Sequence, residues 1–376
     1  MHNILIPPHL FHYRFNMSDT PLPNEQLFDI NQFERVSSVV ESEFFVEEKL
    51  VEHGVPTFYV KVGDDSKVAF LRLIKKFDEM KLLPLLRRIN DRPVLRVVPK
   101  PITKPYRPVI NILLLLATIG ATFFSGYFLS LGLPEFIPNP FVGAAEFTVA
   151  ILAILGAHEM GHKLAANKHG VEATYPYFIP GLPPIGTFGA VIQQKSLSPN
   201  KDALFDLGAS GPVIGFIVTV VVTAVGVMLS PVVPVSQVPP NTSSINVPIL
   251  FDLFIAMLKW PTSGNSVLLL HPVAFAGWVG MIVTMLNLLP TGMLDGGHTA
   301  RSLLGERALY VLTFFSLAAL LVMGYWLMFF FVLFLSFYRH PGPLDDVSKL
   351  SSGRKVFVFV LIAIFLLSVV PLATIF

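Results

Sequence analysis

The sequence predicts a polytopic α-helical membrane protein of about seven spans, with a small N-terminal α+β soluble domain. Of its 376 residues, 53% are hydrophobic and 14% are charged, and the mean hydropathy of +0.65 is too high for a soluble protein of this length. Apolar stretches long enough to cross a bilayer recur from residue 109 onward, whereas residues 17–107 mix charged and apolar residues at helical and strand spacing. No cysteine occurs, which excludes disulfides, thiolate metal sites and cysteine nucleophiles.

The N-terminal region, residues 1–107, is expected to be cytoplasmic and to contain a compact β-α-β unit. Its expected elements are an amphipathic helical stretch near 25–53, a strand at 57–62, a helix at 66–83 and a strand at 93–99. Residues 72–107 hold eleven Lys/Arg against three Asp/Glu, and such a surplus just before a span favours the cytoplasmic side. A basic linker at 100–108 leads into the bilayer. Nothing in this region identifies a binding site, so binding a cytoplasmic regulator, sensing a ligand and assisting assembly all stay open as its role.

Seven spans are expected, six in a membrane-embedded core at 108–338 and one after a cytoplasmic loop within 339–376. They are placed at 109–131, 142–166, 204–229, 267–289, 308–323, 325–338 and 355–376. With the N-terminus inside, the outside loops contain only Lys259 as a basic residue. The inside loops contain Lys168, Lys195, Lys201, Arg301, Arg307, Arg339, Lys349, Arg354 and Lys355. The topology depends on a hairpin at Gly324, because a single tilted helix there would place the following basic loop outside.

The most informative motif is H-E-x-x-H at His158, Glu159 and His162, within the predicted span 142–166. Residues four apart share a helix face, so the two histidines can bind one metal ion while Glu159 reaches a water beside it. Ionisable residues at membrane depth cost about 2.5–3.5 kcal/mol each, so three of them need an offsetting partner such as a metal. On a soluble helix the same pattern would indicate a solvated charge cluster. In a span it favours a zinc site.

Asp295 is the expected third ligand. The predicted span 267–289 descends to the same side of the membrane as the two histidines and ends at Pro290, which cannot continue a regular helix. Asp295 is the only carboxylate in residues 253–305. The alternative role, a helix N-cap, is the weaker interpretation. His298 is interpreted as an interfacial residue, because a fourth protein ligand would close the site to water.

The expected site therefore holds one zinc ion per chain through two histidines and one aspartate, with one position open for water. Zinc is inferred from the ligand types, since imidazole and carboxylate remain when cysteine is absent. Glu159 would accept a proton from the attacking water and deliver it to the leaving amine. The chemistry indicated is metal-assisted hydrolysis of a peptide bond.

Three motifs in this order resemble the site-2 protease family of zinc intramembrane proteases, over roughly residues 108–338. They are H-E-M-G-H at 158–162, G-A-S-G-P at 208–212 and N-x-x-P-x-x-x-L-D-G at 287–296. The nearest likeness is to archaeal members and the plant chloroplast branch, judged by G-T-F-G-A-V-I-Q-Q-K-S at 186–196. The resemblance implies that His158, His162 and Asp295 hold zinc and that Glu159 is the catalytic base. No PDZ-like domain lies between the spans, so gating of substrate by such a domain is not expected.

The resemblance also implies residues that bind substrate. A helical substrate must unwind locally before its peptide bonds can be attacked, and an edge strand offers the freed backbone new hydrogen bonds. Residues 186–192 are expected to be such an extended segment, with Gly186, Phe188 and Gly189 at the substrate. Asn287 is expected to hold the substrate backbone as well.

The sequence thus predicts an intramembrane zinc endopeptidase that cuts single-span membrane proteins near their cytoplasmic end, in regulated proteolysis. It would be a multi-pass protein of the cell membrane, with the lipid bilayer and its substrates as partners and no nucleic acid. The alternative function is a metal-ion transporter in which the same ligands form a transit site. Ligands staged across several spans would favour a transporter, and in this sequence they are concentrated at one depth.

Overall fold

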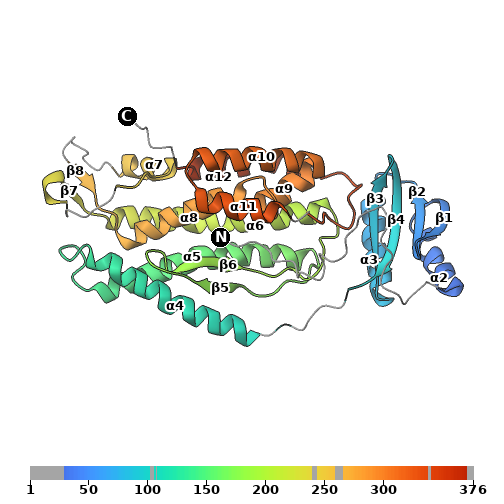
Figure 1. Ribbon diagram of the computed structural model, residues 1–376, viewed down its shortest axis with the longest axis horizontal. Helices are drawn as coiled ribbons and strands as arrows, with labels where there is room; N and C mark the ends of the chain where they lie inside the picture. Colours follow the sequence, from blue (N-terminus) through green and yellow to red (C-terminus); the bar gives the residue numbers. More distant parts are fainter. Residues whose placement is uncertain are drawn as a thin grey trace.

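A computed structural model gives the fold of the chain and describes residues 29–101, 106, 108–238, 244–258, 266–337 and 340–370. Figure 1 shows a bundle of long helices lying along the longest axis of the molecule, with a small α+β domain at one end. Most of the predicted linker, and residues 25–28 of the predicted helical stretch, lie outside the described residues.

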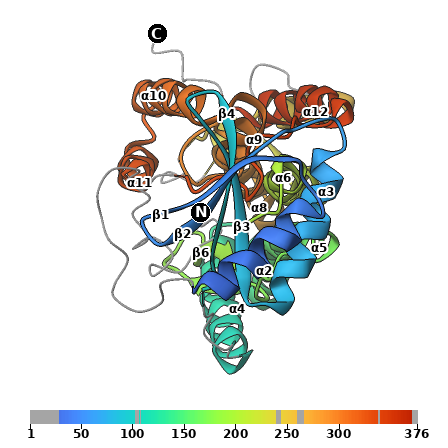
Figure 2. The same ribbon diagram turned by 90° about the vertical axis from the view of Figure 1, so that its right-hand side faces the viewer.

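The N-terminal domain is an antiparallel sheet of four strands with two helices packed on one face (Figure 2). The sheet order is β1-β2-β4-β3. The elements are α2 (Ile30–Glu41), β1 (Val46–Glu52), β2 (Val55–Val60), α3 (Ser66–Glu79), β3 (Leu82–Ile89) and β4 (Arg92–Pro99). Its core contains the fully buried Phe58, Phe70 and Phe77, which come from β2 and α3.

The predicted β-α-β unit is wrong in two places, because two strands were missed. β1 lies inside the predicted helical stretch and β3 begins inside the end of the predicted helix. β1 has four acidic residues or lysines among its seven positions, and β3 lacks regular alternation, so neither shows a clear strand pattern. The missed signal is in the turns. His53-Gly54 and Asn90-Asp91 all have positive φ, as the two central residues of a tight type I′ hairpin turn require.

Glu43, in the turn between α2 and β1, forms two ion pairs with α3. The side chain of Glu43 is only 5% exposed and pairs with Arg72 at 2.8 Å and Lys76 at 2.6 Å. Burial raises the pKa of this carboxyl, but the hydrogen bonds and charges of Lys76 and Arg72 outweigh burial and hold the pKa below its ordinary value of 4.5.

Because the folded state lowers the pKa of Glu43, its contribution to stability is present above about pH 4.5 and is lost as the pH falls further. We therefore expect the backbone amides of β1 and α3 to lose hydrogen-exchange protection more steeply below pH 4.5 in the wild type than in Glu43→Gln. Glutamine does not titrate, so its protection should be lower at pH 7 but flatter with pH. Parallel curves would contradict the assignment.

Three helices are long and apolar enough to cross a membrane among the described residues: α4 (Pro108–Leu131), α5 (Pro140–Lys168) and α6 (Lys201–Leu229). They match the first three predicted spans. The helices α5 and α6 pack closely, because Gly161 of α5 and Gly211 of α6 lie where the two backbones nearly touch. An added Cβ at Gly161 would lie 2.6 Å from the carbonyl oxygen of Ser210.

The other four predicted spans correspond to shorter helices, so seven spans stay a prediction. They are α8 (Pro272–Leu288), α10 (Glu306–Val322), α11 (Trp326–Ser336) and α12 (Ser352–Ser368). The predicted start of the fourth span at 267 is wrong, since residues 266–268 form strand β8. The hairpin at Gly324 is present: this residue has φ of +76° between α10 and α11, which lie side by side in Figure 1.

Three smaller features complete the core. The hairpin of β5 (Tyr177–Pro180) and β6 (Thr187–Val191) lies beside α4 and α5 (Figure 1). The short helix α9 (Asp295–Leu304) follows the proline break after α8. At the far end of the bundle from the N-terminal domain lie β7 (Val232–Pro234), the 3₁₀ turn η1 (Val235–Gln237), α7 (Ile249–Met257) and β8 (Ser266–Leu268).

Residues 340–346, which we call the strap, join the N-terminal domain to the helical bundle. The backbone of the strap pairs in parallel with β3, through Leu86 and Asp345, and on its other side with Asn200 at the start of α6. Leu344 of the strap is 3% exposed and belongs to the core of the N-terminal domain. The sheet of that domain is thus continued by two segments of the bundle.

Candidate metal centre

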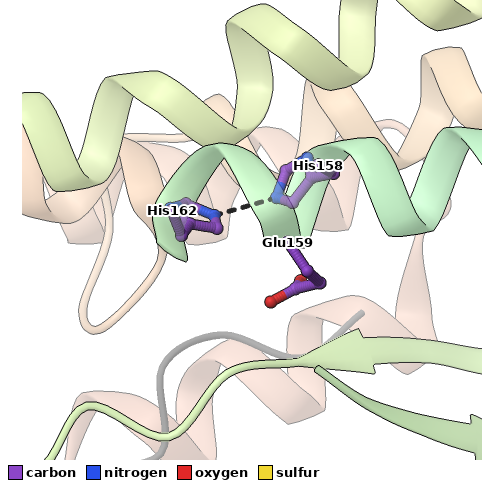
Figure 3. Close-up of side chains that lie close together, drawn as sticks. All are labelled: His158, Glu159 and His162. Atoms are coloured by element: carbon purple, nitrogen blue, oxygen red, sulfur yellow. Dashed lines mark hydrogen bonds between the residues drawn. The ribbon is translucent and has the colours of Figure 1, made fainter. Parts of the chain in front are cut away.

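The two histidines of the H-E-x-x-H motif meet inside the bundle, one helical turn apart on α5. Their Nε2 atoms are 3.1 Å apart, and both side chains are nearly inaccessible to solvent. Figure 3 shows the two rings next to each other on the helix. A run of apolar residues from Phe147 to Ala157 leads into the motif, interrupted only by Thr148 and Gly156, which keeps this part of α5 within the bundle. The shared face predicted for His158 and His162 is confirmed.

Asp295 brings a carboxylate to the same point from α9. The side chain is fully buried, and its Oδ2 lies 3.1 Å from Nε2 of His158 and 3.3 Å from Nε2 of His162. The helix begins at Asp295 itself, and its N-cap is Leu294, so the alternative N-cap role for Asp295 is not adopted. Gly296 and Gly297 permit this placement, because a Cβ at either would lie within 2.4 Å of a carbonyl oxygen before α9.

These three atoms fit a metal ion. Ligand atoms bound tetrahedrally at about 2.0–2.1 Å lie about 3.3 Å from one another, close to the separations found. The second oxygen of Asp295, Oδ1, is buried without a hydrogen-bond partner among the described residues. With neutral imidazoles, Asp295 and Glu159 would leave two negative charges in the interior, which a divalent cation balances.

The backbone of α6 orients both rings. Nδ1 of His162 donates a hydrogen bond of 2.7 Å to the carbonyl oxygen of Leu207, which leaves the lone pair of Nε2 for a metal. Gly211 lies directly against this ring, since an added Cβ would be 2.1 Å from its Nε2. Gly215, one turn further, lies beside His158, since an added Cβ there would be 3.0 Å from Nδ1 of this histidine. The motif G-A-S-G-P therefore makes room for the ligands as well as for helix packing.

Glu159 points away from the rings, toward the β5–β6 hairpin (Figure 3). Its Oε2 accepts a hydrogen bond of 2.8 Å from the backbone N–H of Ile192, the residue that follows β6. Glu159 and the two histidines offer ligand atoms that all lie within 4.8 Å of one another. We assign the third ligand to Asp295 rather than Glu159, because its oxygen is much closer to both nitrogens and Glu159 is already bonded to the hairpin.

Of the four residues predicted to bind substrate, Asn287 contacts the centre. Asn287 is buried at the end of α8, and its Nδ2 lies 3.3 Å from Nε2 of His158. The predicted extended segment is present as β6, which carries Phe188, half exposed, and Gly189. Gly186 lies in the preceding turn with φ of +78°, where a Cβ would collide with the backbone of α4 at Ala121. Binding of substrate by these four residues stays a prediction.

The interpretation of His298 as an interfacial residue is wrong. The side chain is 2% exposed, and its Nδ1 lies 2.6 Å from Nε2 of His340 in the strap. Sequence reasoning also missed the partners Leu207 and Ile192, which act through backbone atoms and leave no residue-type signal. For His298 a signal existed, since it follows Asp295 by three residues and so lies on a neighbouring position of the same helix face.

Comparisons with known proteins agree with the geometry. The family profile described as "Peptidase family M50" matches residues 146–331. The chain is 34% identical over 247 residues to "Probable zinc metalloprotease EGY1, chloroplastic" of Oryza sativa subsp. japonica, covering 62% of this chain and 42% of that protein. The EGY1 protein of Arabidopsis thaliana is 32% identical over 246 residues, covering 62% and 44%. "Probable zinc metalloprotease EGY2, chloroplastic" of Oryza sativa subsp. indica is 27% identical over 301 residues, covering 74% and 53%.

The chain spans less than half the length of both EGY1 proteins. No solved structure matches the chain. The matched family segment contains the whole candidate centre, from the H-E-x-x-H motif on α5 through Asp295 on α9.

Proposed function

Because the chain belongs to peptidase family M50, the site-2 protease family, we propose that it is a zinc-dependent intramembrane endopeptidase. Its substrates would be single-span membrane proteins, cut near their cytoplasmic end to release a cytoplasmic domain. The observation that carries this proposal is the buried triangle of His158, His162 and Asp295 with Glu159 beside it, on a helix able to span a membrane. The names of the EGY relatives as zinc metalloproteases support zinc as the ion.

The zinc ion would supply a Lewis acid that polarises the scissile carbonyl and acidifies water. Glu159 accepts a proton as the oxygen of water forms a bond to the carbonyl carbon. The same carboxylic acid then gives the proton to the amide nitrogen as the C–N bond breaks, which leaves a new carboxyl end and a new amino end. The N–H of Ile192 donates to Oε2 and would hold the Glu159 side chain in place during both steps.

The β5–β6 hairpin would present the substrate. β6 pairs with β5 along one edge, and the residue that follows β6 is Ile192, which is bonded to Glu159. A substrate strand added along the other edge would have its backbone hydrogen bonds satisfied inside the membrane. Phe188 would contact substrate side chains, and Asn287 would hold a backbone carbonyl near the metal.

The basic residues support a cytoplasmic N-terminal domain. Lys168, Lys201 and Arg354 lie at the ends of α5, α6 and α12 that face this domain in Figure 1. The metal centre on α5 lies toward that same end, because His162 precedes the end of the helix by six residues. The cell membrane is the membrane we propose, and a cytoplasmic regulator is a candidate partner of the N-terminal domain.

The test compares wild type with Glu159→Gln in cleavage of a single-span substrate in vesicles, together with the zinc content of each. Glutamine keeps the hydrogen bond from Ile192 but cannot accept a proton. We expect equal zinc and a loss of at least about a hundredfold in cleavage rate. Equal cleavage by both proteins would overturn Glu159 as the base. Zinc-dependent transport across the vesicle without cleavage would support the metal transporter instead.

A further inference from the structure

The strap contacts two separate parts of the molecule. One is the sheet of the N-terminal domain, and the other is α9, which carries Asp295. The strap follows α11 in the chain and is one of the best buried loops of the bundle: Leu344 is 3% and Asp345 0% exposed. A short buried loop held on both sides transmits displacement rather than absorbing it.

Toward the N-terminal domain, the strap is held as a strand. Leu86 of β3 donates to Leu344 at 2.9 Å, and Asp346 donates back to the carbonyl of Leu86 at 3.1 Å. Arg87 adds its guanidinium, whose Nη1 donates to the carbonyl oxygen of Leu344 at 2.8 Å. The opposite edge of the strap is bonded to Ser198 and Pro199, just before α6. The strap backbone is therefore held between β3 on one side and the residues just before α6 on the other.

Toward α9, the strap is held by side chains. Asp346 accepts two hydrogen bonds from the guanidinium of Arg301, at 3.1 and 2.6 Å, in a two-pronged ion pair. The arginine side chain is only 5% exposed. Gly342, with φ of +68°, allows the strap to pass close to this arginine, because a Cβ there would lie 2.8 Å from its Nη2.

The second link is a chain of imidazoles with defined protons. The N–H of Gly342 donates to Nδ1 of His340, so a neutral His340 carries its proton on Nε2. That proton is donated to Nδ1 of His298 at 2.6 Å, which places the proton of a neutral His298 on its own Nε2. This Nε2 is buried without a partner among the described residues. The strap thus sets the ring orientation of His298, three residues after Asp295.

We propose that the strap makes the N-terminal domain a positioning element of the metal centre, with His340 and Asp346 as the positioning residues that hold α9 and hence Asp295. The inference rests on the proposed zinc site. It assigns a role to the N-terminal domain, to which no site could be assigned from sequence. A partner that pulls β3 from the strap would loosen Asp295 and lower metal occupancy.

The test measures the rate at which zinc leaves the full-length protein in detergent when a chelator is added, a readout that needs no substrate. Asp346→Asn weakens the ion pair with Arg301, and His340→Phe removes the bond to His298. We expect each to speed zinc loss about tenfold, the lower end of the effect of residues behind metal ligands. His340→Gln, which keeps a donor near the position of Nε2, should restore much of the retention.

Arg87→Gln tests the N-terminal domain itself, because Arg87 contacts the strap and not α9 in the bonds described above. We expect faster zinc loss together with faster hydrogen exchange at Leu86 and Asp346. Glu43→Gln is the control. It removes the ion pairs of Glu43 with Arg72 and Lys76 in the same domain, which do not involve the strap, and should leave zinc loss unchanged.

Two results would overturn the inference. One is unchanged zinc loss in folded Asp346→Asn and His340→Phe. The other is unchanged zinc loss in Arg87→Gln when exchange at the strap has risen, since loosening the N-terminal domain from the strap would then leave the metal centre unaffected. A wild type that retains zinc but cleaves nothing would contradict the proposed function only, because the zinc-loss comparison would still decide the role of the strap.

Discussion

Asp295→Ala should leave the purified protein without tightly bound zinc and without any detectable cleavage. The variant removes the one oxygen that lies within 3.3 Å of both histidine nitrogens, and two imidazoles alone hold zinc poorly in competition with water. Because the carboxylate is fully buried, its removal also takes away a negative charge that a divalent ion would need in this interior. Metal analysis after gel filtration gives the zinc content, and a single-span substrate in vesicles gives the rate.

A matched control separates metal binding from helix stability. Asp295 lies in the first turn of α9, where an acidic residue also stabilises the helix by about 0.3–1 kcal/mol through the helix dipole. Asp252 also lies in the first turn of its helix, as the fourth residue of α7, and is exposed; α7 lies at the end of the bundle far from the N-terminal domain. Asp252→Ala should keep one zinc per chain and full activity. One zinc per chain in Asp295→Ala would show that Asp295 is not a ligand.

Gly211→Ala should displace His162 and lower zinc affinity by at least about a hundredfold. The new methyl group would lie 2.1 Å from Nε2, the atom assigned to the metal, so the ring or the helix must move. The helix has little freedom, because α5 and α6 are already in backbone contact at Gly161 and Ser210. Ring displacement of about 1 Å is enough for a loss of this size.

Helix propensity alone would make Gly211→Ala stabilising, so a loss of zinc affinity in this variant cannot be a general effect on the helix. Alanine in a helix interior is favoured over glycine by about 0.5–1 kcal/mol, so a general effect would stabilise the variant. Gly120→Ala is the control, since Gly120 lies within α4 and nothing is within 4 Å of its added Cβ. Zinc titrations of the two variants should differ by the full hundredfold. Equal affinities would mean that Gly211 serves helix packing alone.

The meeting of His158, His162 and Asp295 was predictable, because residue types that can bind a metal are visible in the sequence. His158 and His162 are spaced by one turn, and Asp295 is the one carboxylate near a proline break at the correct depth, so spacing and scarcity pointed to them. The same reasoning failed for His298, whose burial depends on His340, a residue 42 positions later in the chain. The spacing of His298 from Asp295 gave a signal for its place on α9, but spacing within one helix does not identify a partner such as His340.

In the N-terminal domain, too, some elements were predictable from the sequence and others were not. The helix α3 and the strand β2 were predictable, because their apolar residues recur at regular spacing. β1 and β3 were not, because an edge strand rich in charge and a strand with consecutive leucines do not alternate. The pairing of β3 with the strap could not be predicted either, since it joins residues 86 and 345.

The distance along the chain between the metal ligands has a consequence for biosynthesis. His158 and Asp295 are 137 residues apart, and the strap that holds α9 comes still later. A ribosome delivers the chain from its N-terminus, so the H-E-x-x-H helix is made and inserted well before its aspartate partner exists. During that interval the centre lacks Asp295 and contains only the residues of the H-E-x-x-H motif. The residues that meet at the centre are all present only when the last third of the chain has been synthesised.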